Sequence, residues 1–469
     1  RVVVPAEPRS LNQAVDNNAS SMGISRLVTE RLVEVDGLTG EALPGLVQSW
    51  ERSDDLTWVL HLAEGATFSN GEVFDAEAAL YSIFTARDMP GAYAAYVQTI
   101  ADAVATDDLT VTLTTTQPLG FVPTLLAVIP ALPPVAYSET TPEDFGRAPI
   151  GTGPFVVESW TPGQSLRLAR NDAYWGEPAS LAGVEITWNS EPESRIALLE
   201  TDQVDIVKGI PPQLVDRAES GGFEVLGVDS IGVIVLQPNS KVAPFDDVRV
   251  RQAAAHAIDR QALVDVIFSG VGATEHGSVF PSTYASGVAP EGAFTYDPAR
   301  SAELLAEVGD IGPIDLYWPN GRYLLDTQVG EALAGMLEEA GFTVERHPME
   351  VGAYFELLLT DEMPGMHIVS IAAAYPHESN ALNSFFLPNS VVTYCAQADL
   401  VEPDNVGKSL EGEERTAAYT EIARQLVVDH VCPIPLYIER QNWAVSADVT
   451  GFAPRGDEDL DLARVQLGG

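Results

Sequence analysis

The sequence predicts an α/β fold with mixed sheets, and three observations lead to this class. Short runs of alternating apolar residues, typical of strands, interchange with amphipathic stretches of helical period along the chain. Apolar residues make up 46% of the 469 residues, enough for a large core. No internal repeat of about 20 to 50 residues is present, which excludes solenoids and propellers. The length itself corresponds to about three domains or lobes.

The first half of the chain contains several separate strand patterns and one clear helix signal. Apolar alternation predicts strands at 57–62, 111–115 and 166–169. A helix is predicted at 75–84, where Asp75 provides an N-cap before a run of apolar residues at helical spacing. Asn70-Gly71 predicts a turn just before this helix, because glycine readily adopts positive φ.

A second alternation of helices and strands follows a proline-containing segment. Pro238 and Pro244 interrupt both periods within 237–244, so we expect a lobe boundary there. A long helix is predicted over 247–268, with Asp246 as its cap and Arg249 and Arg251 on its exposed side. Beyond it, the patterns predict strands at 314–318, 342–345 and 367–371, helices at 326–339 and 351–359, and a helix start at Tyr296-Asp297-Pro298.

The charge balance excludes two classes of partner. Lys and Arg number 25 against 68 Asp and Glu, for a formal net charge of −43. Phosphate backbones and anionic lipid surfaces attract basic proteins, so the sequence predicts no nucleic-acid binding and no membrane-surface role. The sequence contains no window of about 18 uninterrupted apolar residues, so it predicts no transmembrane helix.

The known catalytic motifs are missing from the sequence. It contains neither the G-x-S-x-G turn of serine hydrolases nor an H-E-x-x-H zinc motif. Its seven histidines are scattered singly, without the spacing of metal ligands. We therefore expect a protein that is not an enzyme, with no catalytic residues, no metal site and no cofactor.

The two cysteines, Cys395 and Cys432, are compatible with one disulfide in an oxidising compartment. Two buried free thiols are the alternative. The chain opens on a strand-like Arg1-Val2-Val3-Val4-Pro5 without an initiator Met, which suggests a mature form from which a leader was removed. We therefore expect an exported protein, periplasmic or on the exterior of the cell envelope, with a lipid anchor on the full-length form as an open alternative. We also predict the disulfide.

Five sequence blocks together resemble the extracytoplasmic solute-binding proteins of ABC importers, in the peptide/nickel/opine class called family 5. The blocks occur in the family's order over about nine-tenths of the chain. They are Leu43-Pro44-Gly45-Leu46 with Phe68-Ser69-Asn70-Gly71, Gly151-Thr152-Gly153-Pro154-Phe155 with Ala173-Tyr174-Trp175-Gly176, Phe245-Asp246-Asp247-Val248-Arg249, Tyr296-Asp297-Pro298 and Pro433-Ile434-Pro435-Leu436-Tyr437.

The resemblance implies a two-lobed periplasmic-binding-protein fold with a hinge and an extra subdomain in the first lobe. Lobe 1 is then formed by 1–30, 150–238 and 445–469, its added subdomain by 31–149, and lobe 2 by 239–444. A monomer of this kind captures a small polar ligand between its lobes and delivers it to the transmembrane subunits of an ABC permease. A ligand sensor or an enzyme on the same scaffold is the alternative.

Three segments match the walls of the ligand pocket in this family, and two aromatic residues near the C-terminus could contribute to sugar binding. A solvated N-terminal loop, and an ion pair of Arg322 with Asp326, are the structural alternatives. The candidate ligand-binding residues are Asn17, Asn18, Ser20, Trp318, Arg322, Tyr323, Tyr375, His377, Glu378, Tyr437 and Trp443.

One position departs from the family pattern. Peptide-binding members carry an aspartate for the peptide's free amino group, where this sequence has Ala374. A buried ammonium group without a carboxylate is costly, unless Glu378 substitutes for it. The ligand classes that stay open are oligopeptides, modified peptides, opines and sugar conjugates. We expect a ligand that is polar or carries a local negative group, which Arg322 would bind, with aromatic stacking supplying much of the affinity.

Overall fold

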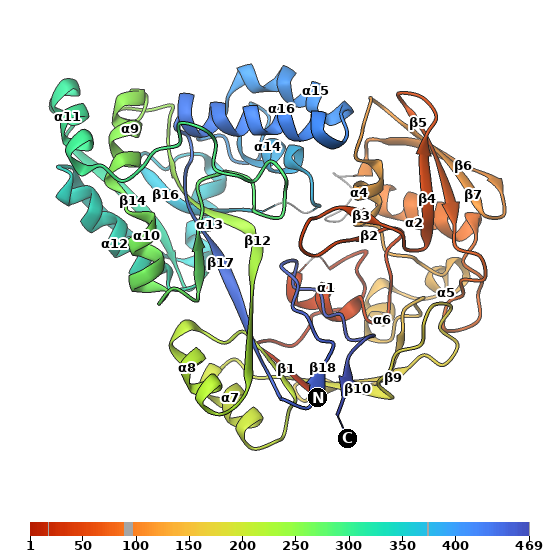
Figure 1. The fold of residues 1–469 in the computed structure, drawn as a ribbon. Coiled ribbons are helices and arrows are strands. Elements are labelled where there is room, and N and C mark those ends of the chain that lie inside the picture. Colours follow the sequence, from red (N-terminus) through yellow and green to blue (C-terminus); the bar gives the residue numbers. More distant parts are fainter. Residues whose placement is uncertain (17, 89–96, 373–374, 469) are drawn as a thin grey trace. The chain divides into compact units, whose positions relative to one another are not determined.

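The computed structural model describes residues 1–469 apart from 17, 89–96, 373–374 and 469. The chain forms two compact units (Figure 1): unit 1 comprises 1–228 and 441–469, and unit 2 comprises 229–440. Two long strands, β12 (Glu224–Pro238) and β17 (Ile434–Val445), lead the chain from one unit to the other. Among the described residues, no helix has both the length and the apolar character needed to cross a bilayer.

The boundaries between the two units lie at lower residue numbers than those predicted from the sequence. The predicted boundaries were 238/239 and 444/445, whereas the units divide at 228/229 and 440/441. The reason is that β12 continues as a paired strand up to Pro238, whose partner in β16 (Met366–Ala372) is Met366. Both prolines of the 237–244 segment therefore lie inside unit 2.

Unit 1 is built around a sheet with the short strand β1 (Val2–Val4) in its interior. β1 pairs in parallel with β10 on one side and β11 on the other, and its three valines are buried on both faces. The sheet continues from β10 (Gly183–Trp188) to β9 (Ser165–Arg170) and β8 (Phe155–Thr161), and from β11 (Ile206–Lys208) to β17. Its helices are α1 (Ala19–Ser25), α7 (Pro192–Glu200) and α8 (Pro212–Ser220).

A separate four-stranded antiparallel sheet lies within the segment predicted as a subdomain. Its order is β4 (Val47–Arg52), β5 (Thr57–Leu62), β7 (Thr110–Thr115) and β6 (Ile100–Asp107). The strand predicted at 57–62 has these bounds in the structure. Helix α2 (Ala76–Asp88) follows Asp75, whose carboxylate accepts a hydrogen bond from the amide of Ala78 at 3.0 Å, as expected of an N-cap. The short elements here are β2 (Glu34–Val35), β3 (Ala42–Leu43), α4 (Val122–Leu126), α5 (Pro134–Ser138) and α6 (Pro142–Arg147).

The two glycines of the Gly151-Thr152-Gly153 motif allow a close backbone contact. A Cβ atom on Gly151 would lie 2.0 Å from the carbonyl oxygen of Val28, and one on Gly153 would lie 2.8 Å from that of Leu27. Neither distance is possible for a larger residue without movement of the backbone. The motif therefore has a structural role in bringing the strand β8 against the segment after α1.

Unit 2 has a mixed sheet whose two faces carry separate hydrophobic cores. The order is β15 (Thr343–Glu350), β14 (Pro313–Asn320), β16 and β12, with β14 parallel to both of its neighbours. Alternate residues of these strands enter opposite cores. One core includes α9 (Val248–Ala257), α11 (Pro298–Val308) and α12 (Asp326–Glu339), and the other includes α13 (Val351–Thr360), α14 (Glu378–Phe385) and α16 (Gly412–Arg424). Strand β13 (Ala273–Glu275) pairs with β17, and α15 (Val401–Ser409) packs against α16.

The long helix predicted over 247–268 is wrong in its extent. Helix α9 ends at Ala257, Ile258 is extended, and Asp259 caps a new short helix, α10 (Arg260–Ala262), through the amide of Ala262. A π-helical turn over Leu263–Ile267 follows. A second N-cap aspartate thus interrupts an apolar pattern that by itself would continue the helix.

Two details at the start of this helix also differ from the prediction. The cap is Asp247, which accepts from the amide of Arg249 at 2.9 Å, and not Asp246. Arg251 is buried, with 7% of its surface exposed, instead of facing solvent. Its guanidinium donates to the carbonyl oxygen of Phe245 at 2.5 Å and to that of His430 at 2.7 and 2.8 Å. Arg251 therefore ties α9 to a segment near the end of unit 2.

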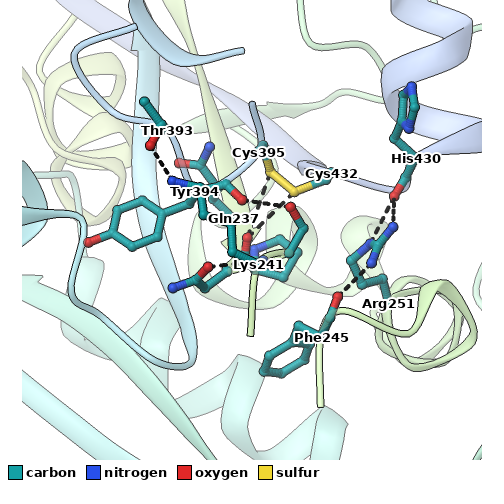
Figure 2. The surroundings of a disulfide bond; sticks show 12 residues. Gln237, Lys241, Phe245, Arg251, Thr393, Tyr394, Cys395, His430 and Cys432 are labelled. Atoms are coloured by element: carbon teal, nitrogen blue, oxygen red, sulfur yellow. Dashed lines mark hydrogen bonds between the residues drawn. A yellow bond between two sulfur atoms is a disulfide. The ribbon is translucent and has the colours of Figure 1, made fainter. Parts of the chain in front are cut away.

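Cys395 and Cys432 form the predicted disulfide, next to this arginine (Figure 2). Their Cα atoms are 5.4 Å apart, and both residues are fully buried in unit 2. The turn that carries Cys395 is also held by Ser240, whose backbone amide and hydroxyl donate to the carbonyl oxygen of Tyr394 at 3.1 and 2.7 Å. The disulfide, the Ser240 contacts and Arg251 together connect three distant parts of unit 2.

We predict that replacing both cysteines, in a Cys395→Ala, Cys432→Ala double variant, lowers the free energy of unfolding by about 3 to 4 kcal/mol. The bond closes a loop with a sequence separation of 37, and the chain-entropy cost of leaving such a loop open is of this size. Urea unfolding of the oxidised wild type and the variant measures the difference. Two titratable thiols per chain in denatured, unreduced wild-type protein would contradict the bond.

Candidate functional site

Two of the predicted pocket segments follow strands that end at the same edge of the sheet of unit 2. β14 and β16 run in parallel, so their carboxyl ends lie together, and the chain continues from them into 321–325 and toward Tyr375. A hydrogen bond joins the loop after β14 to β16: the backbone amide of Ser370 donates to the Tyr323 hydroxyl at 3.1 Å. The carboxyl edge of parallel strands is where ligands bind in many α/β proteins.

The loop after β14 is organised by the carboxylate of Asp326. This buried group accepts hydrogen bonds from the backbone amides of Gly321, Arg322 and Tyr323, at 2.7 to 3.0 Å. Gly321 adopts φ +91°, a conformation that favours glycine. Asp326 is thus engaged by the backbone, and the structure does not show the alternative ion pair between Asp326 and the Arg322 side chain.

Arg322 is held on this loop with its charged group exposed. Its guanidinium carbon lies 5.2 Å from the centre of the Tyr323 ring, a cation–π contact. Among the described residues, no carboxylate forms an ion pair with Arg322. The loop therefore presents a positive, planar group that can form paired hydrogen bonds with a carboxylate or phosphate.

Three of the predicted aromatic residues, Trp318, Tyr437 and Trp443, are completely buried. Trp318 packs below α12, where a Cβ on Gly330 would lie 2.3 Å from the indole ring. The Tyr437 ring lies 4.8 Å from that of Phe268, and Trp443 belongs to the core of unit 1. These contacts give all three a packing function, and ligand contacts for them stay a prediction.

Tyr375, His377 and Glu378 belong to a buried polar cluster of unit 2. His377 caps α14 by accepting from the amide of Ser379 at 3.2 Å, and burial holds the pKa of its imidazole well below the usual range. Glu378 is 1% exposed; it accepts from the Ser286 hydroxyl at 2.5 Å, and the Nε atom of Arg415 lies 3.9 Å from its other oxygen. The cluster explains these polar residues structurally, and their role toward a ligand stays a prediction.

The N-terminal candidates are described only in part. Asn18 is exposed, and its backbone amide donates to the carboxylate of Asp16 at 3.0 Å. Ser20 lies in α1, Asn17 is outside the described residues, and so are 373–374, including Ala374. A ligand role for this loop stays a prediction.

Unit 1 contains a pocket of about 600 Å³ that the sequence patterns did not predict. It is lined by side chains from three distant segments, including Arg26, Glu30, Tyr174, Arg455 and Asp459. Two of the lining arginines are already engaged: Arg26 pairs with Asp459 and with a second carboxylate, and Arg455 pairs with a neighbouring aspartate at 2.6 Å. No local motif announces such a pocket, because only the fold brings the segments together.

Glu30 is one of the lining carboxyl groups that form no ion pair among the described residues. It accepts hydrogen bonds from the Tyr174 hydroxyl at 2.6 Å and from the indole nitrogen of Trp175 at 2.8 Å. Burial disfavours its charged form and raises its pKa to about 7. Glu30 thus changes its protonation state close to neutral pH.

Comparisons with known proteins give a consistent picture. Residues 41–391 match the family model described as "Bacterial extracellular solute-binding proteins, family 5 Middle". The glutathione-binding protein GsiB of Escherichia coli (strain K12) is 31% identical over 447 residues, which cover 89% of this chain and 85% of that protein.

Solved structures agree with the family match. The ABC transporter substrate-binding protein CtaP of Listeria monocytogenes has a TM-score of 0.87 at 18% identity, with coverage of 100% of this chain and 99% of that one. NikA of Brucella suis, in complex with Fe(III)-EDTA, has a TM-score of 0.86 at 21% identity, with coverage of 99% of both chains. The predicted fold class is confirmed by these likenesses.

We predict that Glu30→Gln stabilises unit 1 at neutral pH. The unfolded carboxyl group titrates near 4.5 and the folded one near 7, so the unfolded state loses its proton first as the pH rises between these values. The wild type therefore loses stability relative to the variant across this window, by about 1 to 3 kcal/mol in total. Glutamine keeps both contacts, because its amide can donate to the Tyr174 hydroxyl and its oxygen can accept from Trp175.

Denaturant unfolding of both proteins at pH 4.5, 6 and 8 measures this difference, and the remaining carboxyl groups cancel between them. A stability difference that does not change with pH would contradict a raised pKa for Glu30.

Proposed function

Because the chain belongs to the bacterial extracellular solute-binding proteins of family 5 and is the substrate-binding component of an ABC importer, we propose that its ligand is a small peptide-like anion of the glutathione class. Such a ligand carries more than one carboxylate. The observation that carries the proposal is the exposed guanidinium of Arg322, held on a preorganised loop at the carboxyl edge of β14 and β16.

The relationship to a named glutathione-binding protein supports this ligand class. The 31% identity to GsiB extends over 89% of the chain, so it includes both units and not only a shared motif. The likeness to CtaP and NikA, at 18% and 21% identity, supports the fold but does not distinguish between ligands.

Electrostatics also favour an anchored carboxylate. With a net charge of −43, the protein repels anions at long range, so an anionic ligand needs a local cation. Arg322 can supply this cation because Asp326 is engaged by backbone amides. A bidentate arginine–carboxylate contact is directional as well as charged, and it therefore selects for the position of the carboxylate.

The residues available for an amino group point in the same direction. The sequence has Ala374 where peptide-binding members carry an aspartate. Glu378, the possible substitute, is buried and bonded to Ser286. Recognition through the ligand's carboxylates is thus favoured over recognition through a free amino terminus.

The family membership also defines the setting in which the protein works. Proteins of this kind are exported, bind small ligands and interact with the permease subunits of their importer. We propose in addition that this chain acts as a monomer and that its full-length form is anchored by lipid. Light scattering of the purified protein, and mass spectrometry of the envelope-extracted form, test these two points.

We predict that Arg322→Ala weakens the binding of reduced glutathione by about 1.5 to 3 kcal/mol, because a charge-assisted hydrogen bond is lost. Isothermal titration calorimetry on the wild type and the variant measures this loss. Arg300→Ala is the matched control: Arg300 is also an exposed arginine of unit 2, but it pairs with Glu303 at 3.0 Å, and its removal should leave affinity unchanged.

Two results would overturn the proposal. The first is a wild-type protein that binds neutral dipeptides but not glutathione. The second is an unchanged affinity in Arg322→Ala together with lost affinity in Glu378→Gln, which would mean that the ligand is recognised through a positive group.

A further inference from the structure

Asp315, Glu345 and His347 converge on two neighbouring strands of unit 2. In the parallel pair β14–β15, Asp315 is the register partner of Glu345, and Tyr317 is the partner of His347. One donor atom from each of the three side chains lies within 4.8 Å of the others. The opposite face of these strands, with Ile314 and Leu316, is buried in a core.

The imidazole of His347 is held in a fixed orientation. Its ring stacks on that of Tyr317 with centroids 4.6 Å apart and an interplanar angle of 17°. Its Nε2 atom lies 2.6 Å from Oδ1 of Asp315. The imidazole nitrogen and the aspartate oxygen therefore already lie close enough together to bind one metal ion.

The distances fit a small divalent ion. Two ligands of one zinc ion, each about 2.1 Å from the metal, lie roughly 3 to 3.4 Å apart. Insertion of an ion between Nε2 and Oδ1 thus needs less than 1 Å of extra separation, by this estimate. Glu345 is exposed, so its side chain can rotate to supply the third ligand atom, and solvent can complete the coordination.

We propose that Asp315, Glu345 and His347 form an accessible binding site for a divalent transition-metal ion, with one imidazole and two carboxylate ligands. This combination suits zinc and neighbouring metals such as nickel and cobalt. The site lies at mid-strand on β14 and β15, away from the Arg322 loop, and does not depend on the proposed ligand. The strongly negative charge of the protein raises the local concentration of cations.

A bound ion would connect two adjacent strands of unit 2. Since β15 is at the end of the strand order, an ion that binds only the folded pair stabilises this edge of the sheet. The sequence predicted no metal site, because its histidines lack the spacing of metal ligands along the chain. Glu345 and His347 are 30 and 32 positions from Asp315, and strand pairing brings the three residues together.

Isothermal titration calorimetry with zinc chloride alone tests the proposal on the full chain. The wild type should bind one zinc ion at micromolar or lower dissociation constant, and both His347→Gln and Glu345→Gln should weaken this binding at least about tenfold. His430→Gln is the matched control: His430 also contacts a surface aspartate, Asp399 at 3.1 Å, but belongs to no three-ligand group among the described residues, so its loss should have no effect.

Thermal unfolding provides a second readout. Zinc should raise the melting temperature of the wild type and of His430→Gln, and less or not at all that of the two site variants. Glu345→Gln keeps the test valid if His347→Gln fails to fold, because Glu345 is exposed. The proposal is overturned if the wild type binds no zinc in this range, or if Glu345→Gln binds it as tightly as the wild type does.

Discussion

A chain with 68 acidic and 25 basic side chains must give every carboxylate either water or a donor, and this constraint governs how its few cations are used. Asp326 is satisfied by backbone amides alone, and Glu30 by two neutral donors, while burial raises the pKa of Glu30. Arg26 serves two carboxylates at once, Glu34 and Asp459. Because these carboxylates are satisfied by other donors, none of them pairs with Arg322, which is exposed to solvent.

The elements that the sequence predicted accurately depend on neighbours only a few residues away. The strand at 57–62 and the helix at 326–339 have the predicted bounds. The caps Asp75 and Asp297 accept from amides three residues ahead, at 3.0 and 2.9 Å, as their local motifs indicate. Period and capping are local properties, so they can be recognised without knowledge of the tertiary structure.

What the sequence could not predict depends on contacts between distant segments. Arg251 looks exposed by helical period, but carbonyl groups of Phe245 and of His430, 179 residues away, bury it. The position of Trp318 at a predicted strand end indicated a stacking residue, but in the structure α12 packs against its indole ring. Arg322 could be selected because it stands alone beside aromatic residues at a predicted strand end, yet the role of Asp326 in holding its loop is a backbone interaction that residue types do not reveal.

The buried disulfide of unit 2 has a practical consequence for measuring solute capture. The sequence contains two cysteines, and both are consumed in this one bond, with no free thiol among the described residues. A cysteine engineered next to Arg322 would then be the single site of reaction with a maleimide fluorophore. The protein could in this way be converted into a reagentless optical biosensor, whose emission reports the arrival of its solute while the native disulfide stays intact.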